Sequence, residues 1–118
     1  MSHRVAELTA PEAAERLAAG ACAILPMGSL ETHGPHAPMG DFLLAEEICA
    51  RVAERAAGRG ADALVLPPVP FGGEVFFDAV PGGVSLPSPL LQGIVEETAE
   101  ALLRNGARRM LEIGRAHV

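Results

Sequence analysis

The chain has 118 residues and a formal charge of −6 at pH 7, from nine basic and 15 acidic side chains. This length suits one domain and is too short for two ordinary hydrophobic cores. Apolar residues make up 49% of the sequence, which is enough to build a core. The acidic balance excludes a basic face for nucleic acid, and no apolar run approaches the ~20 residues that span a membrane.

The N-terminus and the cysteines both indicate a cytoplasmic protein. Residues 1–10 include the charged Arg4 and Glu7 and lack the apolar segment of a secretory signal. Cys22 and Cys49 are isolated and form no C-x-x-C pair. We therefore expect two free thiols and no structural zinc site made of cysteines.

The first predicted elements are a helix and a strand. Thr9 and Glu12 fit a capping box, and Gly20 suits the position just after a helix end, so a helix is expected between them. Residues 21–26 form a short apolar run with a proline at its end. Such a run is typical of a buried strand.

Two further helices and two further strands follow. A second helix is predicted over about 42–57. One apolar stripe joins Leu44, Ile48 and Val52 with the adjacent Ala45, Cys49, Ala53 and Ala56. A strand is predicted over 63–67. Ser88 is expected to cap a third helix that ends at Asn105-Gly106. A third strand is expected to begin near Arg109.

Apolar strands that alternate with helices predict an α/β fold with a mostly parallel sheet covered on both faces, in three layers α/β/α. Ligands of such sheets bind beyond the carboxyl ends of the strands. The polar loop over 27–41, which follows the first strand, is therefore the expected place for a site.

This loop holds two histidines and two carboxylates. Glu31 and His33 are two residues apart, so in an extended segment their side chains point the same way. Oxygen and nitrogen ligands suit zinc or manganese. Asp41 can return to the same point after the Pro/Gly turn, and three ligands leave positions open for catalysis. The simpler interpretations are a solvated carboxylate for Glu31 and a helix N-cap for Asp41.

Other patterns in the sequence are weaker. The H-x-x-H spacing of His33 and His36 does not define a site by itself. The segment 58–63 matches G-x-G-x-x-A but precedes a strand, which is the reverse of the dinucleotide-binding context, so we interpret it as a turn. Ser29 has no base beside it in the sequence, and a serine nucleophile is not supported.

The sequence resembles the creatininase family of metal-dependent hydrolases. The resemblance rests on the segment 23–41, which contains Glu31-Thr32-His33-Gly34-Pro35-His36 and then Pro, Gly and Asp. It extends to the segment 68–72, with 81–86 after it, and to 105–111. The fold that it implies is the same three-layer α/β/α arrangement, here incomplete.

The resemblance also implies an activity and a set of roles. It implies a centre of two divalent metal ions, zinc, manganese or both, which hydrolyses a C–N amide bond in a small or cyclic amide. By position, Glu31 would bind one ion, His33 the other, and Asp41 would bridge both. His36 would lie beside the ligands or contact the substrate.

The extent of the family pattern predicts that residues 1–111 are the N-terminal part of a single creatininase-like domain. The remaining residues, 112–118, match the translation of a common sequencing adapter, so we expect a non-native tail there. The catalytic acid/base would then lie in the C-terminal half, and the chain alone would be inactive. The full-length protein is expected to form a homo-oligomer.

Two alternatives stay open. Within the family, the enzyme could be a formamide deformylase or a peptide-trimming hydrolase. Outside catalysis, the chain could be an α/β binding module that keeps the scaffold; the presence of Glu31, His33 and Asp41 together argues against this.

Overall fold

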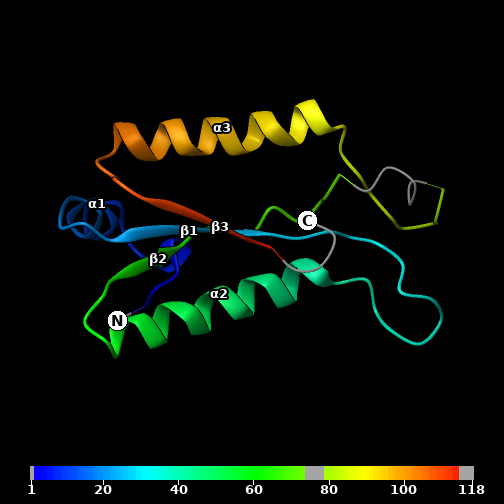
Figure 1. Ribbon diagram of the computed structural model, residues 1–118, viewed down its shortest axis with the longest axis horizontal. Coiled ribbons are helices and arrows are strands. Elements are labelled where there is room, and N and C mark those ends of the chain that lie inside the picture. Colours follow the sequence, from blue (N-terminus) through cyan, green and yellow to red (C-terminus); the bar gives the residue numbers. More distant parts are fainter. Residues whose placement is uncertain (1, 74–78, 115–118) are drawn as a thin grey trace.

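A computed structural model describes residues 2–73 and 79–114 of the chain. In Figure 1 a small sheet lies between two long helices, with a shorter helix at one end. The elements in chain order are a 3-10 turn η1 (Val5–Glu7), α1 (Ala10–Ala18), β1 (Cys22–Met27), α2 (Asp41–Ala57), β2 (Ala63–Val65), α3 (Ser88–Arg104) and β3 (Met110–Gly114).

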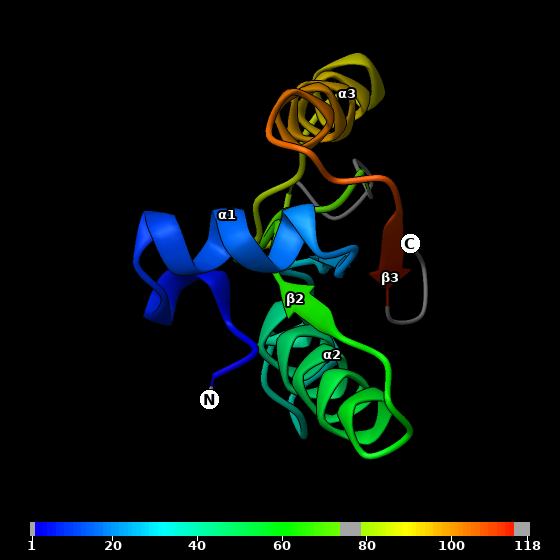
Figure 2. The ribbon, with the colours of Figure 1, turned by 90° about the vertical axis from the view of Figure 1, so that its left-hand side faces the viewer.

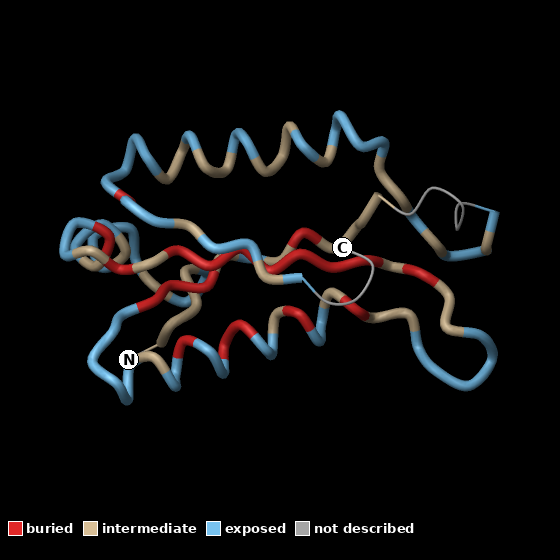
Figure 3. Tube along the Cα trace, viewed as in Figure 1, coloured by how far each residue is buried: buried red, intermediate tan, exposed pale blue. Residues whose placement is uncertain are grey.

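The sheet is parallel throughout the described residues, as the alternation of helices and strands predicts. Its strand order is β2-β1-β3, so the first strand of the chain is the central one. Cys22 pairs with Ala63 on one side, and Ala23 pairs with Met110 on the other. The burial of β1 (red in Figure 3) follows from this central position.

The two faces of the sheet are covered by different helices. Ile24 packs with Cys49 and Ala53 of α2, and the next residue of β1, Leu25, belongs to a second cluster that contacts α3. Successive side chains of a strand point to opposite faces, which is why neighbours enter different clusters. Figure 2 shows α2 and α3 on opposite sides of the sheet. The predicted three-layer α/β/α class is confirmed.

The predicted boundaries of the first helix are confirmed. The Thr9 side chain accepts a hydrogen bond from the backbone N–H of Glu12 at 3.3 Å. At the other end, Gly20 has φ +102°, and the backbone N–H of Ala21 bonds to the carbonyl of Arg16. This is the Schellman ending of a helix, which a glycine forms without a steric penalty.

The face of α2 that packs on the sheet is only part of the predicted apolar stripe. The buried apolar positions are the small residues Ala45, Cys49, Ala50 and Ala53, three of which belong to that stripe. Its larger side chains are exposed by 41%, 39% and 39%, at Leu44, Ile48 and Val52 respectively. The small residues let the helix lie close to the sheet. In the part of the chain that the structure describes, the large residues beside them are exposed to solvent.

Both cysteines are free, as predicted. Cys49 is completely buried between α2 and the sheet. Burial, with a smaller contribution from the nearby Glu46 carboxylate, raises the pKa of the Cys49 thiol. Cys49 therefore acts as a small core residue.

Two predicted boundaries shift by one or two residues. Strand β2 ends at Val65 instead of continuing to Pro67, because proline has no N–H for a sheet ladder. The chain returns to β1 at Val69, whose N–H bonds to the carbonyl of Pro26. Helix α3 begins at Ser88, with Pro87 rather than Ser88 at the N-cap position.

Strand β3 continues to Gly114, so residues 112–114 pair with β1. Residues 115–118 lie outside the described part of the chain, and the non-native origin of 112–118 stays a prediction. Among the described helices, none has the length and apolar character to cross a membrane.

Candidate metal centre

The loop between β1 and α2 is closed at its base by its own backbone. Leu30 and Gly40 form an antiparallel bridge, and Leu30 also bridges to Val84. The chain between Leu30 and Gly40 leaves the sheet and returns to it. As a result, Glu31 and Asp41, which flank this base, lie close together.

The start of α2 is held against the end of β1 at Gly28. A Cβ atom at Gly28 would lie only 2.3 Å from Cα of Phe42 and 2.4 Å from its Cβ. These distances are shorter than any real contact, so the position requires glycine. This close approach places the first turn of α2, and with it Asp41, beside the loop that follows β1.

Three side chains that were predicted as metal ligands converge here. Glu31, His33 and Asp41 each offer one ligand atom, and these atoms all lie within 4.8 Å of one another. In the described residues this is the only group of its kind. Glu31 is 2% exposed and Asp41 is 6% exposed, while His33 is partly exposed.

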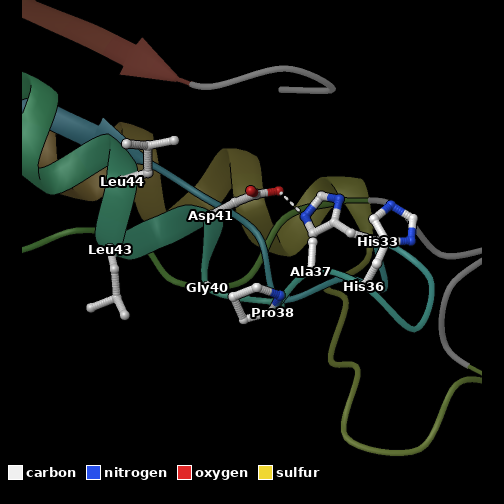
Figure 4. Close-up of a pocket in the computed structure, with 8 residues that line it drawn as sticks. All are labelled: His33, His36, Ala37, Pro38, Gly40, Asp41, Leu43 and Leu44. Atoms are coloured by element: carbon white, nitrogen blue, oxygen red, sulfur yellow. Dashed lines mark hydrogen bonds and ion pairs between the residues drawn. The ribbon is translucent and has the colours of Figure 1, made fainter.

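Asp41 Oδ2 makes two side-chain contacts within and beside the cluster. His33 Nε2 lies 3.0 Å from this oxygen, and Ser29 Oγ donates a hydrogen bond to it at 3.1 Å. Figure 4 shows the Asp41 carboxylate and the His33 ring directed toward one another across the end of the loop. The contact with Ser29 spans twelve positions of the sequence, and no local pattern predicts it.

Asp41 is the first residue of α2, and Gly40 occupies the N-cap position. The default interpretation of Asp41 as an N-cap is therefore wrong in register by one residue. A carboxylate in the first turn is still stabilised by the positive end of the helix dipole.

His36 lies near the cluster without belonging to it. It is exposed and lines a cavity of about 590 Å³ together with His33, Asp41 and residues of the loop and of α2. This position is compatible with contact to a substrate, which stays a prediction for His36.

The donor set fits a divalent cation. Two carboxylates and one imidazole provide oxygen and nitrogen ligands, which suit zinc or manganese. Buried carboxylates are costly unless positive charge or hydrogen bonds compensate them. Fold and cluster together define an α/β protein with a candidate divalent-metal site at the carboxyl end of its central strand.

Comparison with known proteins agrees with this description. The creatininase family, described as creatinine amidohydrolase, matches residues 6–115. The creatinine amidohydrolase of Pseudomonas putida is 41% identical over 118 residues, which cover 91% of this chain and 42% of that protein. The mycofactocin precursor peptide peptidase of Mycolicibacterium smegmatis is 36% identical over 76 residues, which cover 63% of this chain and 31% of that protein.

Solved structures of creatininase superpose on the chain. A manganese creatininase matches with a TM-score of 0.83 at 39% identity, covering 95% of this chain and 44% of that one. A mutant creatininase of Zn-Zn type matches with a TM-score of 0.82 at 36% identity and the same coverage. The chain belongs to the creatininase family. It spans less than half the length of these relatives.

Proposed function

We propose that this chain carries part of a binuclear metal centre that hydrolyses a C–N amide bond in a small or cyclic amide. Glu31 would bind one divalent ion, His33 the other, and Asp41 would bridge both. The observation that carries the proposal is the convergence of these three side chains within 4.8 Å. The metal would be zinc, manganese or both; creatininase structures of both forms are known.

The burial of the cluster supports this role. Glu31 and Asp41 bring two carboxylates into a volume from which water is largely excluded. Like charges at this separation repel each other, and a divalent cation between them would convert this repulsion into attraction. His33 is more exposed and reaches the cavity, where an ion would also be open to substrate.

When bound, divalent ions polarise the amide carbonyl and lower the pKa of water, so that hydroxide is available near neutral pH. The residues of this chain hold the ligands and shape the space for the substrate. The cavity of about 590 Å³ lies within the usual range for small-molecule sites. His36, which lines this cavity, would contact a bound amide.

We propose further that the 118 residues by themselves do not hydrolyse amides. The protein ligands in the described residues number three, and the chain spans 42% of the Pseudomonas enzyme. The group that protonates the leaving nitrogen would come from the C-terminal half of a longer enzyme. That longer enzyme would be cytoplasmic and would form a homo-oligomer.

A peptide-trimming activity is the second candidate. It is favoured by the similarity to a peptidase that acts on the mycofactocin precursor peptide. The cavity opens at the surface beside the exposed residues 34–38, so a peptide end could reach the cluster.

The metal centre is tested by titrating the chain with Zn²⁺ and Mn²⁺ and following the heat of binding. We expect the wild type to bind, and His33→Ala and Asp41→Asn to lower the affinity by more than about tenfold, since each removes a ligand. His3→Ala is the matched control, because His3 lies near the N-terminus and contacts Arg16. Equal affinities for all four proteins would contradict the proposal and favour a non-catalytic binding module.

The same preparations, loaded with metal, are then incubated with creatinine and with short peptides. We expect no hydrolysis by the 118-residue chain. Turnover of either amide that is lost in His33→Ala would overturn the proposed inactivity and would also identify the substrate class.

A further inference from the structure

Ser29 has no role in the proposed function, although it is a buried polar neighbour of Asp41. It follows Gly28 at the end of β1 and is 4% exposed. Its hydroxyl donates to Asp41 Oδ2 at 3.1 Å, the same oxygen that His33 Nε2 approaches at 3.0 Å. One carboxylate oxygen is therefore oriented from two sides.

The two contacts differ in what happens to them when a metal binds. A histidine that ligates through Nε2 can no longer donate a proton from that nitrogen, because a lone pair is needed for the metal. The hydrogen bond between His33 and Asp41 would then be lost, although both side chains would hold the same ion. The Ser29 hydroxyl keeps its proton when the ion binds, so its hydrogen bond to Asp41 can persist.

The position of Ser29 is fixed by its backbone surroundings. The N–H of the preceding residue, Gly28, bonds to the carbonyl of Val69 at 2.9 Å. Further along the same segment, Gly72 passes so closely that a Cβ built on it would lie 3.2 Å from Cβ of Ser29. A donor packed against a neighbouring backbone segment keeps its direction, which is what the support of a metal ligand requires.

We propose that Ser29 is a positioning residue, which holds the Asp41 carboxylate in its ligating orientation once His33 has turned to the metal. The inference rests on the proposed metal centre. Metal-ligating carboxylates are themselves usually hydrogen-bonded, and loss of such a partner weakens metal binding without removing a ligand.

The test measures Co²⁺ binding, with its visible absorption as a spectroscopic report on ligand geometry. We expect Ser29→Ala to weaken Co²⁺ binding by about 10- to 100-fold and to change the absorption spectrum of the bound ion. Ser29→Thr retains the hydroxyl and is expected to bind within a few-fold of wild type. Thr98→Val is the matched control, because its hydroxyl donates to the Ile94 carbonyl within α3, away from the cluster.

The outcomes separate this inference from the proposed function. A wild type that binds no Co²⁺ would overturn the metal centre and the role of Ser29 together. A wild type and Ser29→Ala with the same dissociation constant and the same spectrum would overturn the role of Ser29 alone. If Ser29 served only to fill the core, Ser29→Ala would lower the melting temperature of the metal-free chain and leave the affinity unchanged.

Discussion

Gly28 shows how one residue without a side chain places a site. The start of α2 lies against the end of β1 at a distance that leaves no room for a Cβ atom. Asp41 precedes Phe42, the residue that makes this contact, so any displacement of the helix start also displaces the carboxylate. Stability and metal binding are therefore coupled at this position.

We expect Gly28→Ala to destabilise the chain by about 1–3 kcal/mol, the usual cost of adding atoms to a packed interior. The same variant is expected to weaken Zn²⁺ binding, since α2 must move away from the loop. Urea unfolding and zinc titration measure the two effects.

Gly93→Ala is the control for this variant. Gly93 lies in α3, and a Cβ there would meet nothing within 4 Å. We expect it to stabilise the chain by about 0.5–1 kcal/mol, because alanine is the better helix former. A Gly28→Ala protein as stable as wild type would show that α2 shifts freely.

The candidate ligands could be selected from the sequence, but their support could not. Glu31 and His33 share a direction because they are two residues apart, and Asp41 was expected to return after the Pro/Gly turn. The bridge between Leu30 and Gly40 and the hydrogen bond from Ser29 join positions about ten residues apart. Contacts of this kind depend on the loop path, which residue spacing does not encode.

At the scale of elements, one ion pair connects α1 to the turn before β2. The Arg16 guanidinium donates to both oxygens of Asp62, at 2.9 and 2.6 Å, and also to the Ser2 carbonyl. The hydrogen bond from Arg16 lowers the pKa of Asp62, and the same bond raises the pKa of Arg16. The pair thus holds the N-terminal segment and α1 on the sheet.

The lowered pKa of Asp62 fixes the sign of a pH effect. A carboxylate whose pKa is lower in the folded chain than in the unfolded chain stabilises the fold at pH values above its unfolded pKa of about 3.9. This contribution is lost as the pH falls through the folded pKa. We expect Asp62→Asn to cost about 0.5–1 kcal/mol at pH 7, because the pair is partly exposed.

Urea unfolding of wild type and Asp62→Asn at a series of pH values checks this expectation. The difference between the two proteins should shrink as the pH falls below about 4. A difference that stays constant down to pH 2.5 would mean that Asp62 acts through packing or through a neutral hydrogen bond.

Element types and order were predictable from the sequence, whereas the width of the buried face of α2 was not. Thr9 and Gly20 define the ends of α1 by local hydrogen bonding, which sequence motifs report directly. For α2, periodicity predicted one broad apolar stripe, in which the larger side chains are exposed. The side with Ala45 and Ala53 packs on the sheet, because only small side chains leave room for the helix to lie close to β1 and β2.

At the scale of the whole molecule, the described chain exposes several large apolar side chains. They lie on both helix layers and on β3: Leu43, Leu44, Ile48, Val52, Leu90, Leu103 and Leu111. Strand β3 pairs with β1 along one side. Exposed apolar surface and open strand edges both favour association.

We therefore expect the 118-residue chain to self-associate, with a weight-average mass above 12.2 kDa that rises with concentration in sedimentation velocity. Leu111→Lys places a charge on β3 and should shift the chain toward the monomer. Gln92→Lys makes the same change of charge at an exposed polar position of α3 and should have little effect. Equal shifts for the two variants would indicate that net charge, rather than the strand, controls association.

The central position of β1 also sets an order of events during folding. Its partners come late in the chain, since Cys22 pairs with Ala63 and Ala23 with Met110. Closing the longer loop costs more chain entropy, and non-local pairing is slow. On the ribosome, the unit from β1 to β2 would be complete while residues beyond 65 are still being added. All three candidate ligands lie within that unit, whereas Val84, which bridges to Leu30 at the base of their loop, is added later. The ligands are therefore synthesised before the backbone that supports them is complete.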